Sequence, residues 1–326
     1  MNTKPSICVV ICSNARGRIL LQTIRNLLPE ITQSGSDLLI IDQLCDHDAD
    51  VVSQLSALHR ENKLRWLRVA AGDLTAKRNI GLKSSHADII LFVDDDVLVP
   101  KDFINRHLSH YCSDPRVDGV TGQVFHARNA FQPPELDNPK VNSIAHFATT
   151  QEPRLNLSWP SRSVLETNPV DDRDDTSSSF VATRHFIGCN HSVRRTAALA
   201  IGGYDEQFIA SSQCEDFDMS DRLADAGHLL IYDPNAWLIH LRAPSGGTRS
   251  GQTWPEWTRT ANIFMYMFRH ARTHHNYCSL LWRALRTGPL RKTVIMSPHA
   301  WLAAWMAIAK GISYGWRHRR FKKLSS

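Results

Sequence analysis

Hydrophobic and polar positions follow two alternating patterns through the first part of the chain. Short, mostly apolar runs, typical of buried strands, occur at 7–12, 38–41, 66–69, 89–93 and 117–124. Between them, apolar residues recur at helical spacing, which predicts helices over 18–28, 50–60, 75–83 and 103–111. Strands that alternate with helices favour a mostly parallel sheet with right-handed crossovers. We therefore predict an α/β fold.

The alternation lapses after residue 125 and resumes near residue 186. The span 126–185 has little periodicity and is rich in proline, aspartate and serine. A loop of this length in a compact domain is usually functional or mobile, so we expect it to flank the active site. The alternative is an insertion with no part in the chemistry. Beyond it, the pattern predicts a helix over 215–226 and strands at 229–232 and 236–239.

The helix predicted over 215–226 carries an acid on its apolar stripe. By its 3.6-residue period, four positions share the inward stripe: Asp216, Met219, Leu223 and Ala226. Four others share the opposite, solvated side: Glu215, Asp218, Arg222 and Asp225. A capping box formed with Ser212 would explain Glu215. It would not explain an inward carboxylate at Asp216.

Three carboxylates, Asp94, Asp95 and Asp96, follow the apolar run 89–93. Because side chains alternate along a strand, Asp94 and Asp96 should point one way and Asp95 the other. Like charges repel unless a cation lies between them, and Mg²⁺ is usually held by one or two carboxylates plus substrate phosphates. Ligands of open α/β sheets bind at the carboxyl ends of strands. We therefore predict a metal–diphosphate site; the alternative is that Asp96 caps the following helix.

The charge of the chain is unevenly distributed. The formal net charge is +6, but residues 252–326 contain 13 Lys and Arg against a single acid, Glu256. Such a basic tail favours an anionic partner, and since nothing resembles a nucleic-acid module, we expect a membrane surface. Trp residues beside clustered cations in 290–326 suit a helix that lies in the membrane interface. The alternative is an amphipathic helix that packs on protein.

Two further features bear on the compartment. The apolar stretch 298–314 is interrupted by Lys310, and a spanning helix needs about 20 apolar residues. The seven cysteines include no C-x-x-C pair, which favours a reducing compartment and no zinc site. We therefore expect a cytoplasmic protein, peripheral on the inner face of the plasma membrane if the tail binds lipid.

Several segments together resemble the family 2 glycosyltransferases, which are inverting enzymes with the GT-A nucleotide-sugar fold. The resemblance covers residues 6–125 and 186–242. It is carried by VVICSNAR at 9–16, IID at 40–42, AKRNIGL at 76–82, FVDDD at 92–96, GCNHSVRR at 188–195, GGYDE at 202–206 and EDFD at 215–218. It implies a Rossmann-like GT-A domain over 1–250, with a donor half at 1–125 and an acceptor half at 126–250. A basic, amphipathic helical extension over 251–326 would follow.

The resemblance also implies roles for individual residues. Asp216 would be the catalytic base. Mn²⁺ or Mg²⁺ would be bound by Asp94, Asp96 and His240. The donor side would comprise Cys12, Ser13, Arg16, Asp42, Lys77, Arg78, Asp94 and Asp95. The acceptor side would comprise Gly188, Cys189, Asn190 and Glu215. Gln43 replaces the second acid that the family usually has after the Asp42 position, which leaves the nucleotide open.

The expected function is metal-dependent, inverting transfer of a sugar from a nucleotide-diphosphate donor to an acceptor hydroxyl, in cell-surface glycan or polysaccharide synthesis. A divalent ion would stabilise the diphosphate charge, and a carboxylate would take the acceptor proton. The acceptor would be a glycan or a lipid-linked molecule. One alternative is a sugar-phosphate nucleotidyltransferase, for which 13–17 makes a poor phosphate loop. The other is a non-catalytic nucleotide-sugar-binding protein, which would not need Asp216 and His240.

Overall fold

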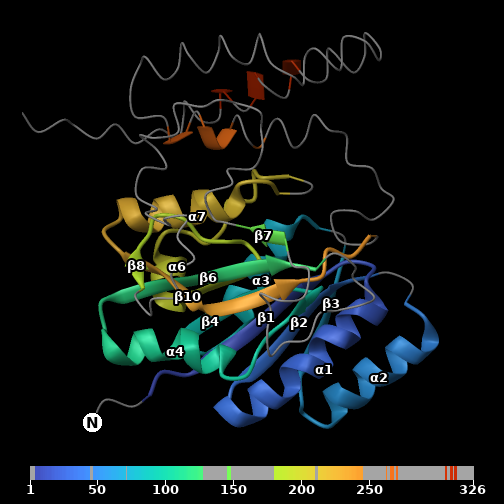
Figure 1. The fold of residues 1–326 in the computed structure, drawn as a ribbon. Coiled ribbons are helices and arrows are strands. Elements are labelled where there is room, and N and C mark those ends of the chain that lie inside the picture. The colour runs from blue at the N-terminus through green and yellow to red at the C-terminus, as the bar shows by residue number, and fades with distance from the viewer. Residues whose placement is uncertain are drawn as a thin grey trace, which may run out of the picture.

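The protein forms a mixed sheet with helices on both faces (Figure 1). The structure, a computed structural model, describes residues 4–44, 47–70, 72–127, 145–147, 180–209 and 212–244. It also describes twelve residues in short helical pieces: 262, 265–267, 269–270, 305–306, 309–310 and 312–313. Most of the predicted loop 126–185 and of the tail 290–326 lies outside the described residues, so the expectations about them remain predictions.

The first part of the chain builds parallel strands joined by helices, as predicted. In chain order the elements are β1 (Ile7–Ser13), α1 (Gly17–Ser34), β2 (Asp37–Gln43), α2 (Ala49–Arg60), β3 (Arg65–Val69), α3 (Leu74–Ser84) and β4 (Ile89–Asp94). Strands β3, β2, β1 and β4 are neighbours in that order, and each pair is parallel. Their carboxyl ends therefore lie at one edge of the sheet, where ligands of such sheets bind.

The second part adds strands that pair in both directions. Its elements are β5 (Val97–Leu98), α4 (Phe103–Ser113), β6 (Val117–His126), β7 (Ala145–Phe147), β8 (Val181–Ala182), β9 (Asn190–Arg194), α6 (Arg195–Ala200), α7 (Glu215–Asp225) and β10 (Leu229–His240). Strand β9 is antiparallel to both β4 and β6, whereas β10 is parallel to β6. The α/β fold with a mostly parallel sheet is confirmed, and the antiparallel pairings are the addition that the sequence pattern did not predict.

Strand β10 replaces the two strands expected at 229–232 and 236–239. It runs unbroken, with an irregular register between Asp233 and Leu238. The irregularity lies where β10 passes close to β6 and β9, and there the Asn190 side chain of β9 donates to the Ala236 carbonyl of β10. A Cβ on Gly122 would lie 1.6 Å from that same carbonyl oxygen, so only glycine fits there.

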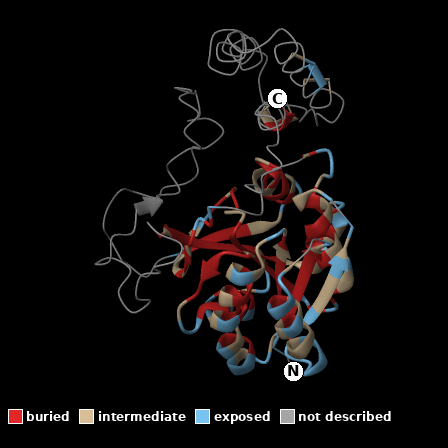
Figure 2. Ribbon diagram, turned by 90° about the vertical axis from the view of Figure 1, so that its right-hand side faces the viewer, coloured by how far each residue is buried: buried red, intermediate tan, exposed pale blue. Residues whose placement is uncertain are grey.

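Two apolar layers cover the faces of the sheet. Val9 and Ile11 of β1 pack with α1, α2 and α4, whereas Val10 between them packs with α3, α6 and α7. This is the alternation that a strand buried on both faces requires. Figure 2 shows the buried residues in red along the sheet and on the helix sides that face it. Among the described residues, no helix is both long and apolar enough to cross a bilayer.

Candidate active site

Three side chains meet where β4 and β10 end. His240, the last residue of β10, pairs with Val97 of β5, and this pairing brings its ring beside the carboxylates that follow β4. Its Nε2 atom lies 3.0 Å from Asp96 Oδ1 and 3.9 Å from Asp94 Oδ2. One ligand atom from each of Asp94, Asp96 and His240 lies within 4.8 Å of the others. The expected metal ligands are therefore brought together.

The environment of Asp96 fits a bound cation. Its side chain is fully buried; Oδ2 accepts a hydrogen bond from the Ala243 amide and lies 3.0 Å from Arg16 Nη1. Oδ1 is buried and has no hydrogen bond to any described residue, despite the nearby His240 ring. Leaving a buried carboxylate oxygen without a hydrogen bond is costly, and a divalent ion removes that cost. Two carboxylates and an imidazole form a donor set suited to Mn²⁺ or Mg²⁺.

Asp96 does not cap the following helix, because Asp102 occupies the N-cap position of α4. Burial alone would raise the pKa of Asp96, but the neighbouring His240 and Arg16 hold it below the ordinary value. The side chain is thus kept ionised in a buried place, as a metal ligand must be.

Asp95 is not part of this ligand set, and it lies in the turn after β4 rather than in the strand. Ser13 donates to its Oδ2 atom at 2.7 Å, and Arg16 Nη1 lies 2.7 Å from Oδ1. Burial raises the pKa of Asp95 to about 6, although Arg16 opposes the shift. Asp95, Ser13 and Arg16 were all expected on the donor side. Their side chains contact one another and connect the end of β1 with the turn after β4.

Asp42 lies at the same edge of the sheet, at the end of β2. In the strand register it is level with Ser13, while Asp94 is level with Cys12. Trp66 Nε1 donates to Asp42 Oδ2 at 3.0 Å, and His47 Nε2 lies 2.8 Å from the same oxygen. The other oxygen, Oδ1, is buried without a hydrogen bond to any described residue.

The donor-side region also contains residues whose position the sequence did not predict. His47 and Trp66 were not among the expected residues, since no local pattern connects them with Asp42. Lys77 is buried and donates to Gln43 Oε1 at 3.3 Å, so Gln43 takes part in a contact at the position where an acid was expected.

Arg78 connects the metal ligands with α7. Its Nη1 atom lies 2.7 Å from Glu215 Oε1, and Nη2 donates to the Gly188 carbonyl at 2.8 Å. Nη2 also lies 3.9 Å from Asp94 Oδ1. The guanidinium stacks over the Tyr204 ring at 5.2 Å. Expected on the donor side, Arg78 is buried between the end of β4 and the start of α7.

Asp216 lies against the turn that contains Gly188. A Cβ built on Gly188 would lie 3.0 Å from Asp216 Oδ2 and 3.3 Å from Arg78 Nη2, so a side chain there would press on both groups. Burial raises the pKa of Asp216, with Arg78 opposing the shift. Burial and the Asp216 charge also raise the pKa of Glu215, to about 8. A carboxylate with a raised pKa is suited to accept a proton.

The two residues after Gly188 lie in different surroundings. Burial raises the pKa of the Cys189 thiol well above its ordinary value, and the charges of Asp94, Asp96 and Asp216 add to the shift. Asn190 was expected to face an acceptor, but its side chain lies inside the sheet. Its Nδ2 atom donates to the Gln123 and Ala236 carbonyls, and its Oδ1 atom contacts His107.

Cys12 is the remaining residue expected on the donor side. Burial raises the pKa of its thiol to about 12, which leaves it protonated and apolar in character. Both Cys12 and Cys189 are free cysteines.

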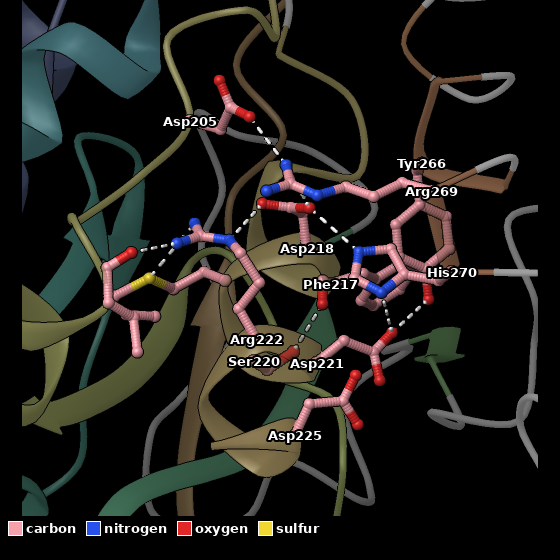
Figure 3. Close-up of polar contacts among 12 residues, drawn as sticks. Asp205, Phe217, Asp218, Ser220, Asp221, Arg222, Asp225, Tyr266, Arg269 and His270 are labelled. Atoms are coloured by element: carbon pink, nitrogen blue, oxygen red, sulfur yellow. Dashed lines mark hydrogen bonds and ion pairs between the residues drawn. The ribbon is translucent and has the colours of Figure 1, made fainter. Parts of the chain in front are cut away.

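The orientation predicted for α7 is wrong in part. Glu215 and Asp218 are buried rather than solvated, and Ala226 is exposed rather than inward. The capping box is also absent, because Cys214 occupies the N-cap position and Ser212 Oγ donates to the Phe208 carbonyl. The physical reason is a second packing partner. Helical residues between 262 and 270 cover the side of α7 that faces away from the sheet (Figure 3).

Comparison with known proteins assigns the family. The family model described as "Glycosyltransferase like family 2" matches residues 5–272. The chain belongs to this family. Its fold is accordingly the GT-A type that the resemblance implied, and the match includes α7 as well as the helical residues between 262 and 270.

Two similar proteins of Mycobacterium tuberculosis are glycosyltransferases by name. An N-acetylglucosaminyl-diphospho-decaprenol L-rhamnosyltransferase is 32% identical over 107 residues, which are 33% of this chain and 31% of the relative. A pre-mycofactocin glycosyltransferase is 28% identical over 165 residues, which are 51% of this chain and 29% of the relative. This family 2 chain therefore spans less than a third of the length of either relative.

Two solved structures share the fold. GalNAc-T7 with UDP, GalNAc and Mn²⁺ superposes with a TM-score of 0.58 at 13% identity, covering 82% of this chain and 51% of the other. The mannosyltransferase PcManGT from Pyrobaculum calidifontis, in complex with GDP-Man and Mn²⁺, gives 0.54 at 14% identity, covering 96% and 76%. At such low identity the likeness concerns the fold alone.

Proposed function

We propose that this family 2 protein is a metal-dependent, inverting glycosyltransferase that moves a sugar from a nucleotide-diphosphate donor to an acceptor hydroxyl. The observation that carries the proposal is the Asp94–Asp96–His240 ligand set, linked through Arg78 to the carboxylates at the start of α7. A metal site and a candidate base thus adjoin at the edge of the sheet where ligands of α/β folds bind.

Asp94, Asp96 and His240 would hold Mn²⁺ or Mg²⁺. Bound there, the ion supplies Lewis-acid stabilisation to the diphosphate leaving group. Arg16 keeps Asp96 in place, and Asp95 in turn holds Arg16. The buried and unpaired Asp42 Oδ1 atom has the position and chemistry to accept a hydrogen bond from a nucleotide base. The two solved structures of the same fold contain UDP or GDP-mannose together with Mn²⁺, which supports this arrangement.

Asp216 would act as the general base on the acceptor hydroxyl. It lies beside Gly188 and near Arg78, which in turn approaches Asp94 of the ligand set. On this proposal the acceptor would approach from the side opposite the leaving group. Displacement in line inverts the configuration of the transferred sugar. Burial favours the protonated product form of Asp216, whose raised pKa strengthens it as a base.

The class of acceptor is proposed by analogy with a similar protein. One relative is named for transfer to N-acetylglucosaminyl-diphospho-decaprenol, a lipid-linked acceptor. We extend this class to the present chain, in line with the basic tail over 290–326. On this proposal the protein works at the inner face of the plasma membrane in glycan or polysaccharide synthesis.

The test is a panel of nucleotide-diphosphate sugars with Mn²⁺ and the purified full-length chain. Release of nucleoside diphosphate, slow without an acceptor and faster with a polyprenyl-diphosphate-linked sugar, would support the proposal. The anomeric configuration of the product, read by proton NMR, distinguishes inversion from retention. A nucleotidyltransferase would instead release pyrophosphate from a nucleoside triphosphate, and a binding protein would turn over no donor.

A further inference from the structure

A short C-terminal segment covers the outer side of α7. The docking segment comprises the described helical residues Asn262, Met265–Met267, Arg269 and His270. Met265 and Tyr266 pack with Phe208 and Cys214, just before the first residue of α7. Asn262 Nδ2 donates to the Ile209 carbonyl at 2.8 Å, and Asn262 Oδ1 accepts from the Ile209 amide at 3.2 Å. The docking segment therefore holds the loop that leads into α7.

Asp218 is the centre of the charged contacts in this interface (Figure 3). Its carboxylate is fully buried; Oδ1 lies 2.9 Å from both Arg269 Nη1 and His270 Nε2, and Oδ2 lies 2.8 Å from Arg222 Nε. Arg269 Nη1 also lies 2.6 Å from Asp205 Oδ2. A buried carboxylate is costly without partners that bind its charge, and two of its three side-chain partners come from the docking segment.

The first turn of α7 is consequently held by two arginines from outside the helix. Arg78 binds Glu215, and Arg269 binds Asp218. Residues two apart on a helix point roughly 200° apart, so a contact that fixes Asp218 also fixes the nearly opposite direction of Asp216. The turn before α7 has left-handed backbone at Ser212 (φ 47°) and Cys214 (φ 71°). Such backbone persists only where its surroundings impose it.

We propose that Arg269 is a positioning residue for the transfer reaction: by bridging Asp218 and Asp205 it fixes the first turn of α7 and hence the direction of the Asp216 carboxylate. The inference rests on the function proposed above, in which Asp216 is the base. It makes part of the predicted C-terminal extension a component of the catalytic unit. The family match, which continues to residue 272, includes this segment.

The test compares three variants of the full-length chain. Arg269→Ala removes the bridge. Arg269→Lys preserves it in part, because both contacts of Arg269 are made by one nitrogen atom, which an ammonium can replace. Arg184→Ala is the matched control. Arg184 pairs with Asp221 and Asp225 in the later turns of α7, and its side chain is 21% exposed against 14% for Arg269.

For Arg269→Ala we expect kcat to fall about 10- to 100-fold, as small displacements of a reacting group do. The donor KM and the affinity for Mn²⁺, measured by electron paramagnetic resonance, should stay at the parent values. Arg269→Lys should recover most of kcat, and Arg184→Ala should retain it. A parent kcat for Arg269→Ala, or an equal loss in Arg184→Ala, would overturn the proposal.

Hydrogen exchange of α7 provides a readout that does not depend on turnover. We expect Arg269→Ala to exchange faster than the parent in the first turn of α7, whereas Arg184→Ala should not. If the parent turns over no donor, the proposed function is wrong. The hydrogen-exchange comparison of Arg269→Ala with Arg184→Ala then still tests whether Arg269 positions the first turn of α7. If Arg269→Ala does not fold, Asn262→Ala replaces it, since it loosens the same loop at Ile209 without exposing a charge. Unchanged exchange in that variant would refute the role of the docking segment.

Discussion

The guanidinium of Arg78 lies 2.7 Å from the Glu215 carboxylate, although 137 residues separate the two in the chain. The same side chain reaches the Gly188 carbonyl and approaches Asp94. One buried cation thus connects the carboxyl end of β4, which bears candidate metal ligands, with the first turn of α7, which bears the candidate base. The relative position of these two chemical groups depends on this contact.

Replacing Arg78 with Met should leave Glu215 buried without a cation. Breaking one side of a buried ion pair typically costs about 3–5 kcal/mol, so we expect a loss of stability of that order. The double variant Arg78→Met with Glu215→Gln should regain part of it, because neither charge then remains. Urea unfolding of the parent, the single variants and the double variant measures the coupling. A double variant as unstable as Arg78→Met would contradict this account of the contact.

Replacing a metal ligand should weaken Mn²⁺ binding directly. We expect Asp96→Asn and His240→Gln to lose more affinity than the roughly 10- to 100-fold that follows loss of a group that only orients a ligand. His228→Gln is the matched control, since His228 pairs with Asp118 away from the ligand set. Chelation should abolish transfer by the parent, and added Mn²⁺ should restore it. Equal Mn²⁺ affinity in His240→Gln and His228→Gln would remove His240 from the site.

Asp216→Asn should keep the metal and the donor but lose transfer. A positioned general base contributes about 10²- to 10⁴-fold, and we expect a fall in kcat of that size. Asp225→Asn serves as the control, because it changes the same chemical group on the same helix, nine residues or about two and a half turns further along. Product formation and donor binding, measured side by side, distinguish the two variants. Parent-level transfer by Asp216→Asn would show that another group takes the proton.

The pH dependence of transfer should reveal the burial of Asp216. Only the ionised carboxylate accepts a proton, so the rate must fall as the pH falls through its pKa. Burial raises that pKa above the ordinary value of 3.8, which places the acid limb of kcat/KM at a higher pH than for an exposed aspartate. The limb should vanish from the residual activity of Asp216→Asn. An acid limb at or below 3.8, with the fold intact, would exclude Asp216 as its source.

The stability of the fold should depend on Asp218 at acid pH. Burial alone would raise its pKa, but His270, Arg222 and Arg269 lower it to about 2, against 3.8 for the ordinary group. The folded state therefore favours the ionised form. This contribution, roughly 2 kcal/mol, is present above the unfolded pKa and is lost as the pH falls from about 4 towards 2. The difference in unfolding free energy between the parent and Asp218→Asn should shrink over that range; a constant difference would mean that the carboxylate charge is not stabilising.

The sequence by itself determined the parallel strands β1 to β4, the helices between them and the position of three aspartates at the end of β4. These are local properties, because side chains alternate along a strand and recur every 3.6 residues along a helix. The three aspartates could therefore be placed at the end of a buried strand before any fold was known. The shared edge of Asp42 and Asp94 also follows from the βα pattern, since parallel strands end on the same side.

Only the tertiary structure decided which distant residues meet and which sides of a helix are covered. The contacts of Arg78 with Glu215, and of His240 with Asp96, join strands and helices whose order in the sheet differs from their order in the chain. The sequence pattern predicted a solvated Asp218, because hydrophobic periodicity detects only a side of the helix that packs through apolar residues. In the structure the other side of α7 packs on the docking segment through charged residues. In the sequence, the residues of a buried ion pair look the same as those of a solvated one. The two differ only in the neighbouring residues that exclude water, and these are known only from the tertiary structure.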